Sequence, residues 1–383
     1  MKFNIGLLGC GHVGSGVYEI LNSNEYLKKY AKIAKVLVKD ITKPREGINS
    51  KLLTDNIDDI LNDESINLVI EVIGGGTLAY EAMKKALMNK KHVITANKEV
   101  LSTHLNELLD IAHKNNVYLM FEASVGGGVP IVRTIINNAK TNQINHIKGI
   151  INGSTNFLMS LIQQMGYPYE KAFKEASRLG YLEADPTADV YGYDPVRKIV
   201  VLSTICFKGD VSIDHAYTYP ISKANDQFII YINNKNYVLK YLAEAYKQDN
   251  MVSIRVEPTI VKKDNIFAMV NKELNIIQFN GENTGVINFI GKGAGKMPTA
   301  NAVISDLVEI IEDRAYVEFE NSQKLNVCYN DLFFNKYLIQ TEEELPEDLI
   351  EYNDGLFHYT KKISARQLEE VTKNAIFYAK IEE

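Results

Sequence analysis

The stretch that decides the fold is residues 3–23, FNIGLLGCGHVGSGVYEILNS, where an apolar run meets three closely spaced glycines. FNIGLL is typical of a short buried strand and SGVYEILNS of a helix. Between them Gly9 allows a tight turn, Gly11 lets a pyrophosphate approach the backbone, and Gly14 lets the helix pack closely on the strand. The stretch predicts a dinucleotide-binding turn, although glycine turns also join strands to helices in other folds.

Strands and helices alternate after this turn. Apolar runs at 33–38, 67–73, 92–95 and 117–123 are expected to be strands, and 78–89 and 99–115 to be helices. This alternation predicts an α/β fold, a doubly wound parallel sheet of the Rossmann type with helices on both faces. Ligands of such sheets bind at the carboxyl ends of strands, where GGG (74–76), TANK (95–98) and EASVGGG (122–128) lie. Lys98, in TANK, is therefore expected to contact substrate or nicotinamide.

The tip of the second predicted strand indicates the cofactor. An acidic side chain there accepts hydrogen bonds from the ribose of NAD, whereas a basic one suits the phosphate of NADP. Lys39 holds this position, Lys43 and Arg45 follow closely, and Asp40 is adjacent. We expect NADP, with NAD also used because of Asp40.

A second domain begins near residue 140. INHIKGIINGSTN (144–156) predicts a strand that runs into a Gly-Ser-Thr turn, and helices follow at 156–167 and 168–181. YVLKYLAEAYKQ (237–248) is predicted to be a helix, whereas 251–261, 265–272 and 285–291 are β-rich, and a glycine turn opens a helix within 291–311. We expect a dinucleotide-binding domain at 1–135 completed by 291–320, an α+β substrate and dimerisation domain at 136–290, and a small module at 321–383.

The chemistry is expected in EADPTADVYGYDPVRK (183–198), which gathers Glu183, Asp185, Asp189, Asp194 and Lys198 before the apolar run IVVLSTICF. Asp194 followed by a proline predicts a helix N-cap, which puts Lys198 in the first turn of a buried helix. Desolvation and the helix dipole are expected to lower the pKa of Lys198 there, so that it can protonate an alkoxide while the carboxylates hold an amino group. An ordinary capped helix with a solvated lysine is the alternative.

Composition narrows the class of protein. The chain has 46% apolar residues and a net charge of -6, which argues against a nucleic-acid partner. Cys10, Cys206 and Cys328 form no CxxC pair, which fits a reducing compartment without disulfides or structural zinc. The apolar stretch before Cys10 is too short for a lipoprotein signal, and no run approaches the length of a membrane span. We expect a cytoplasmic protein with no membrane partner.

Six motifs occur in the order and spacing found in homoserine dehydrogenases, and the chain resembles that family over about residues 1–315. They are GCGHVG, VITANKEVL, FEASVGGGVPIV, GIINGSTNF, ASRLGYLEADPTADVYGYDPVRKIVVL and GAGKMPTANAV. The resemblance implies reversible NAD(P)-dependent interconversion of L-homoserine and L-aspartate 4-semialdehyde, on the route to threonine, methionine and isoleucine. It also implies a homodimer formed through the second domain.

The resemblance assigns roles to individual residues. It makes Lys198 the general acid/base and puts Lys98 near nicotinamide and substrate. Substrate contacts fall on Glu183, Asp189, Asp194, Gly153 and Ser154, with serine where threonine is usual. Cofactor contacts fall on Gly9, Gly11, His12, Val13, Gly14, Lys39, Thr95, Lys98, Gly180, Glu183 and Gly295. A monovalent cation, Na+ or K+, is expected on backbone oxygens of Glu122, Val125, Gly127 and Val129.

Two other functions have less support from the sequence. A semialdehyde dehydrogenase needs a cysteine that becomes acylated, and none of the three cysteines has a convincing nucleophile context. A nucleotide-sensing protein without catalysis would be expected to have lost Lys198 or its carboxylates, and both are present. Residues 320–383 match the regulatory ACT domain of many relatives poorly, so weak or no inhibition by threonine is expected.

Overall fold

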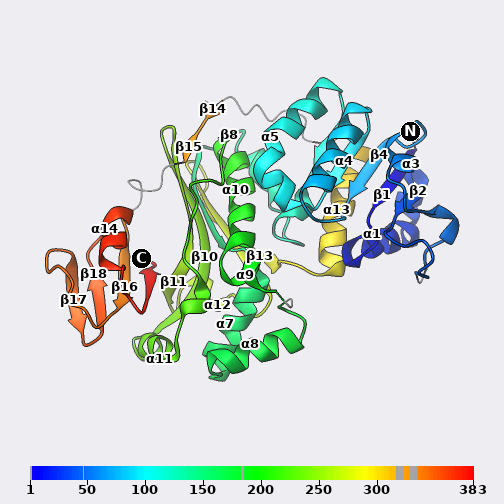
Figure 1. The fold of residues 1–383 in the computed structure, drawn as a ribbon. Coiled ribbons are helices and arrows are strands. Elements are labelled where there is room, and N and C mark those ends of the chain that lie inside the picture. The colour runs from blue at the N-terminus through cyan, green and yellow to red at the C-terminus, as the bar shows by residue number, and fades with distance from the viewer. Residues whose placement is uncertain (1, 46, 183–184, 316–322, 328–333) are drawn as a thin grey trace. The chain divides into compact units, whose positions relative to one another are not determined.

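The computed structural model describes residues 2–45, 47–182, 185–315, 323–327 and 334–383. They form two compact units, each built from segments far apart in the sequence (Figure 1). The first unit joins Met1–Lys140 to Lys292–Ser322, and the second joins Thr141–Gly291 to Gln323–Glu383. Residues 323–383 therefore share a unit with residues 141–291.

The first unit is a parallel sheet in the order β3-β2-β1-β4-β5-β6 with helices packed on it, which confirms the predicted α/β fold. Its strands are β1 (Phe3–Leu8), β2 (Ala31–Leu37), β3 (Leu53–Thr54), β4 (Leu68–Glu71), β5 (His92–Thr95) and β6 (Leu119–Met120). Its helices are α1 (His12–Ser23), α2 (Glu25–Tyr30), α3 (Asp58–Leu61), α4 (Thr77–Met88), α5 (Lys98–Lys114), α6 (Val132–Asn138) and α13 (Lys296–Ile311), with single turns at Ser50–Leu52 and Glu122–Ser124.

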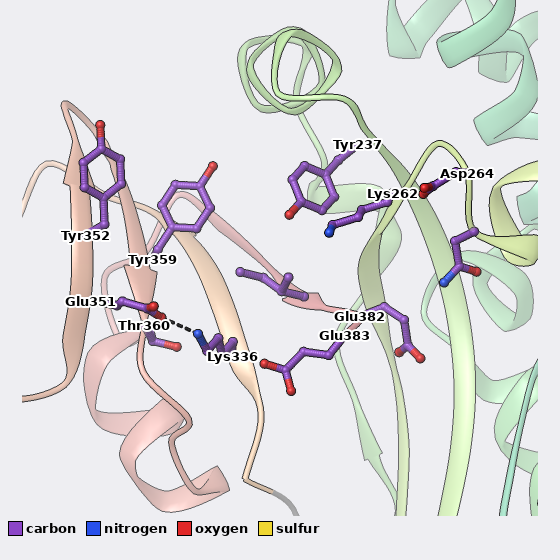
Figure 2. Close-up of a pocket in the computed structure, with 12 residues that line it drawn as sticks. Tyr237, Lys262, Asp264, Lys336, Glu351, Tyr352, Tyr359, Thr360, Glu382 and Glu383 are labelled. Atoms are coloured by element: carbon purple, nitrogen blue, oxygen red, sulfur yellow. Dashed lines mark hydrogen bonds and ion pairs between the residues drawn. The ribbon is translucent and has the colours of Figure 1, made fainter.

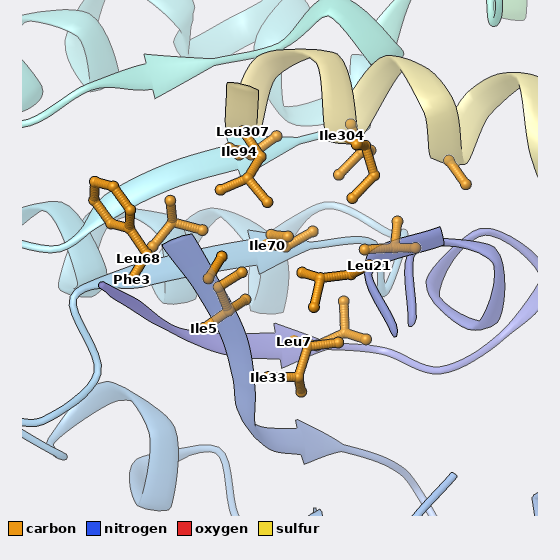
Figure 3. Packing of buried hydrophobic residues seen from close by; sticks show 14 of the residues in the cluster. Phe3, Ile5, Leu7, Leu21, Ile33, Leu68, Ile70, Ile94, Ile304 and Leu307 are labelled. Atoms are coloured by element: carbon orange, nitrogen blue, oxygen red, sulfur yellow. The ribbon is translucent and has the colours of Figure 1, made fainter. Parts of the chain in front are cut away.

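The core of this unit joins both of its segments. Figure 3 shows Ile304 and Leu307 of α13 packed with Ile70 and Ile94 of the central strands, and all four are at most 5% exposed. Helix α13 also packs along α1, the helix that follows the glycine turn. The late segment 292–315 thus completes the core that the first 140 residues begin.

The glycine turn has the geometry that its sequence predicts. Gly9 has φ +102°, a left-handed conformation that favours glycine. A Cβ on Gly14 would lie 2.1 Å from the carbonyl oxygen of Gly9, whereas one on Gly11 would meet nothing within 4 Å. Gly14 is therefore required by packing, and Gly11 leaves open space beside the backbone.

The second unit is built on a larger mixed sheet in the order β13-β12-β7-β10-β11-β19-β16-β18-β17, with β9 and β15 also paired to β11 and a separate pair β14-β8. Its strands are β7 (Ile144–Ile150), β8 (Gly209–Asp210), β9 (Tyr217–Thr218), β10 (Tyr237–Gln248), β11 (Met251–Lys262), β12 (Leu274–Gly281), β13 (Gly285–Lys292), β14 (Gln323–Lys324), β15 (Asn326–Val327), β16 (Lys336–Gln340), β17 (Ile350–Asp354), β18 (Phe357–Thr360) and β19 (Phe377–Ile381). Its helices are α7 (Gly153–Met165), α8 (Tyr169–Arg178), α9 (Thr187–Val190), α10 (Tyr193–Phe207), α11 (Asp226–Asn234), α12 (Ile266–Met269) and α14 (Ala365–Val371), with a single turn at Ile221–Lys223.

Three secondary-structure predictions are wrong. Residues 237–248 form strand β10 instead of a helix, because they pair along their whole length with β11 and also with β7. Within 265–272 the chain forms the short helix α12, which Asn265 caps by accepting a hydrogen bond from Phe267 N. The strand expected at 117–123 is only Leu119–Met120, since a 3-10 turn follows it at Glu122–Ser124.

The last strand ties the C-terminal segment to the main sheet through buried charges. β19 pairs in parallel with β11, and its Lys380, 3% exposed, forms ion pairs with Glu244 of β10 and, at 3.3 Å, with Glu382. Burial raises the pKa of Glu244, but Lys380 and the neighbouring His146 outweigh it and hold that pKa well below the usual range. Within the described residues 334–383 the chain forms strands β16, β17, β18 and β19 and the helix α14.

Gly14→Ala should destabilise the first unit by about 1–3 kcal/mol, because the new methyl group has no space against Gly9. Gly11→Ala is the matched control and should cost much less, since its methyl group meets no atom. Thermal unfolding of both variants would measure this, and equal losses would contradict the packing argument.

Lys380→Ala should cost about 3–5 kcal/mol, because it leaves Glu244 as a buried charge without its lysine. Lys362→Ala removes a lysine from the same segment whose 2.6 Å pair with Glu383 is more than half exposed, and should cost at most about 1 kcal/mol. Chemical denaturation of the two proteins would compare them. A small loss for Lys380→Ala would show that the buried pair does not stabilise this junction.

Candidate active site

Helix α10, which carries the acidic and basic residues of the central motif, begins earlier than its sequence predicts. Its N-cap is Gly192, with φ +89°, so Asp194 is the second helical residue and not the cap. A Cβ on Gly192 would lie 2.6 Å from the hydroxyl of Tyr241, so both the conformation and the packing require glycine. Lys198 consequently lies in the second turn of the helix and not the first.

Lys198 is held by an ion pair within α10. Its Nζ lies 2.6 Å from Asp194 Oδ2, one helical turn away, and donates a second hydrogen bond of 2.9 Å to the carbonyl oxygen of Ile151. The side chains of Lys198 and Asp194 are only 12% and 10% exposed. The structure thus brings the predicted general acid against one of its predicted carboxylates, at the end of β7.

Asn152 completes this cluster and was missed by the sequence analysis, which named only the next two residues. Its Nδ2 donates hydrogen bonds to Asp189 Oδ1 (2.7 Å) and to Asp194 Oδ2 (2.8 Å). Its Oδ1 accepts from Thr155 N, which makes Asn152 the N-cap of α7. Asparagine just before a helical pattern is a capping signal that could have identified it.

The other predicted substrate residues are placed differently. Gly153 and Ser154 are the first residues of α7, directly beside this cluster. Asp185 is exposed and its Oδ1 accepts hydrogen bonds from Thr187 N and Thr187 Oγ1, which lower its pKa, so its carboxylate is engaged by its own turn. Glu183 lies outside the described residues.

In the first unit, neighbouring strand ends bring GGG and TANK together. Thr95 Oγ1 donates to Glu71 Oε2 (2.6 Å), and Asn97 Nδ2 donates to the carbonyl oxygen of Gly75 (2.8 Å). Burial raises the pKa of Glu71. Lys98 is the first residue of α5 and follows the N-cap Asn97, so the hydrogen bond of Asn97 to Gly75 helps to fix the position of the start of this helix.

A cavity of about 650 Å³ lies beside the glycine turn. Arg45, Lys296 and Cys10 line it, together with Ser15, Tyr18, Glu19, Asn22, Ser23, Gly47 and Ile48. Lys39 is exposed and is not among the lining residues. Asp40 Oδ1 accepts from Thr42 N (2.9 Å) and Thr42 Oγ1 (2.6 Å), so its carboxylate is engaged by its own loop.

The remaining predicted cofactor contacts that the structure describes lie at three places in the chain. His12 and Val13 begin α1 at the glycine turn, and Gly295, with φ +119°, is the N-cap of α13, next to the cavity residue Lys296. Gly180 is an exposed glycine with φ +79° just after α8, in the second unit.

The predicted cation loop is buried beside two carboxylates. Glu122, Val125 and Val129 are at most 2% exposed, and Gly127 has φ +55°. The backbone N–H of Glu122 donates to Asp306 Oδ2 (2.8 Å). These carboxyl groups have raised pKa values, from burial at Glu122 and from burial and the neighbouring Glu122 charge at Asp306.

Another cavity lies away from these residues. It has a volume of about 690 Å³ and is lined by residues at the ends of β10 and β11 and by residues of the C-terminal strands (Figure 2). Within it Lys336 and Glu351 form an ion pair, with 2.5 Å between Lys336 Nζ and Glu351 Oε2. None of the predicted site residues lines it.

The cysteines do not form a nucleophilic site in the described part of the chain. Burial raises the pKa of both Cys10 and Cys206, and Cys328 lies outside the described residues. A raised pKa disfavours the thiolate that attacks an aldehyde. Among the described residues there is also no group of three histidine, cysteine or carboxylate side chains that could hold a metal, and no helix with the length and apolar character needed to cross a bilayer.

Comparison with known proteins gives a consistent result along the chain. The family profile described as homoserine dehydrogenase matches residues 130–308, and the profile described as homoserine dehydrogenase, NAD binding domain, matches residues 9–122. Homoserine dehydrogenase of Bacillus subtilis is 38% identical over 315 residues, which is 81% of this chain and 73% of the relative. That of Pseudomonas aeruginosa is 36% identical over 312 residues, 80% of this chain and 72% of the relative.

Solved structures agree with these sequence matches. The crystal structure of a homoserine dehydrogenase from Thiobacillus denitrificans aligns with a TM-score of 0.90 at 28% identity, covering 100% of this chain and 99% of the other. Together with the Lys198 cluster and the glycine turn, these matches show that the chain belongs to the homoserine dehydrogenase family, the NAD(P)-dependent oxidoreductases that act on a CH–OH group.

Proposed function

We propose that Lys198 is the general acid/base in the interconversion of L-homoserine and L-aspartate 4-semialdehyde. The observation that carries this proposal is the buried pair of Lys198 with Asp194, in which the lysine also donates to Ile151 O. These bonds hold the ammonium at one place, as proton transfer to a developing alkoxide requires. A solvated lysine on the helix surface, the alternative, would have no such fixed partners.

The residues of this cluster have different roles in the reduction of the aldehyde. A bound nicotinamide cofactor supplies the hydride that reaches the aldehyde carbon. Lys198 gives one proton to the carbonyl oxygen, which becomes the hydroxyl of homoserine, and recovers a proton from solvent. Asp189 and Asp194, with Glu183, hold the substrate amino group, and Gly153 and Ser154 contact the substrate from the start of α7. In the reverse direction Lys198 accepts the proton.

We propose NADP as the preferred cofactor, with its 2′-phosphate bound by basic residues near the glycine turn. Arg45 and Lys296 line the adjacent cavity, whereas the carboxylate of Asp40, which would favour NAD, is bonded to Thr42. The pyrophosphate would be held by Gly9, Gly11, His12, Val13 and Gly14. The rest of the cofactor would be contacted by Thr95, Lys98, Gly180, Glu183 and Gly295. Lys39, on the same loop, adds positive charge near the phosphate.

A monovalent cation fits the loop that contains Glu122, Val125, Gly127 and Val129. Two carboxyl groups are buried beside this loop, and Asp306 Oδ1 is buried without a hydrogen-bond partner among the described residues. Backbone oxygens of the loop would hold Na+ or K+, whose charge would offset this buried negative charge. The Val129 carbonyl also accepts from Ile131 N, which leaves it one further lone pair.

The broader setting is carried over from the family resemblance. We propose a cytoplasmic homodimer that acts in the synthesis of threonine, methionine and isoleucine. Within each chain the first unit would bind the cofactor and the second the substrate. Light scattering of the purified protein would test the dimer, and oxidation of NADPH or NADH by aspartate semialdehyde would test the reaction.

Lys198→Ala should lower kcat by about 10² to 10⁴-fold, the usual contribution of a general acid/base, with NADP affinity nearly unchanged. Lys262→Ala, on β11 in the separate cavity of Figure 2, is the matched control and should keep wild-type turnover. Steady-state kinetics of both folded variants would decide. Near-normal turnover of Lys198→Ala would remove this lysine from its role.

Arg45→Ala should weaken NADP binding by about tenfold or more while leaving NAD binding almost unchanged, because only NADP carries the phosphate that the guanidinium would meet. Lys39→Ala should have a smaller effect in the same direction, since that side chain is exposed. Equilibrium titration of both cofactors would measure the ratios. The assignment is wrong if NADP binds far more weakly than NAD and neither variant changes the ratio.

A further inference from the structure

We infer that Asn152 is a positioning residue of this reaction: it fixes Asp189 and Asp194 relative to each other and thereby sets the affinity for the amino group of the substrate. The inference rests on the proposed function, which assigns that amino group to these carboxylates. Asn152 itself touches neither the hydride path nor the proton of Lys198 in this scheme. Its effect is exerted through the carboxylates.

The amide of Asn152 is saturated and therefore has one orientation. The residue is 4% exposed. Its two N–H groups donate to Asp189 (2.7 Å) and Asp194 (2.8 Å), and its Oδ1 accepts from Thr155 N (2.8 Å) and Thr155 Oγ1 (2.9 Å). Rotation by 180° would turn the oxygen toward two carboxylates and the NH2 group toward the Thr155 N–H, so these three contacts require the observed orientation, and the Thr155 hydroxyl is compatible with it.

The arrangement solves an electrostatic problem. Asp189 lies on α9 and Asp194 on α10, and two carboxylates bonded to one amide nitrogen repel each other. A neutral amide holds both carboxylates without adding a charge to the cluster, in which Lys198 already pairs with Asp194. The preceding residue, Ile151, accepts a hydrogen bond from Lys198, so two consecutive residues contact all three charged groups.

Helix capping alone does not account for these bonds, and the chain offers a matched comparison. Asn225 caps α11 in the same unit, and its Oδ1 accepts from Phe228 N (2.9 Å). Its amide nitrogen, however, donates to the neutral side chain of Gln340 (2.8 Å). Asn152 and Asn225 therefore share the capping role and differ in whether the amide also binds carboxylates.

Replacement of each asparagine by serine separates the two roles, because serine caps a helix about as well as asparagine but has no amide. Asn152→Ser should raise the KM for homoserine about tenfold or more, as expected when hydrogen bonds to charged groups are lost, with the KM for NADP unchanged. Asn225→Ser should change neither KM. Both variants should unfold within a few degrees of the parent protein.

A second variant covers the case in which Asn152→Ser is not obtained folded. Asn152→Asp keeps the cap and substitutes a third carboxylate for the two donors, so the KM for homoserine should again rise while the KM for NADP does not. Two results would overturn the inference. One is a wild-type KM for homoserine in a folded variant. The other is a rise in both KM values together with a large loss of thermal stability that Asn225→Ser does not show. The proposed function would survive that result if Lys198→Ala remained inactive, and would itself fail if the parent protein did not oxidise homoserine.

Discussion

The pairing of β10 with β11 is the constraint on which the second unit depends. The two strands run side by side over their full twelve-residue length, and both have a second neighbour, β7 on one side and β19 on the other. The end of β7 leads to Ile151 and Asn152, and Tyr241 of β10 packs against the glycine that begins α10. This hairpin therefore supports the starts of α7 and α10, and α10 carries Asp194 and Lys198.

The ionisable side chains held by this hairpin form a cluster with a net charge. Lys198, Asp189 and Asp194 together carry one net negative charge, in a place where the lysine and Asp194 are about nine-tenths buried. Such a set favours a substrate that brings one positive charge of its own. The ammonium group of an amino-acid aldehyde brings a positive charge and a simple aldehyde does not, so in the proposed reaction these carboxylates would favour the amino-acid substrate.

Much of the first unit could be predicted from the sequence, because glycine spacing and apolar runs report local geometry. The parallel sheet and the contact of Gly14 with Gly9 agree with that prediction. The strand at 237–248 could not be predicted in the same way, since its helix-like composition is overridden by pairing with partners far along the chain. Lys198 and Asp194 were singled out from the acidic stretch 183–198 and from the family resemblance, whereas the contacts of Asn152 needed the structure, which brings it to residues 37 and 42 positions away.

Asn152 is followed by Gly153, a dipeptide whose chemistry limits the lifetime of many proteins. Asparagine before glycine loses ammonia when the next backbone nitrogen attacks the side-chain carbonyl, and asparagine is counted among the thermolabile residues for this kind of reason. Here the attack requires the amide to leave Thr155 and both carboxylates at once. These hydrogen bonds therefore oppose deamidation at Asn152, and the rate of that reaction at this position is expected to follow the rate at which the start of α7 opens.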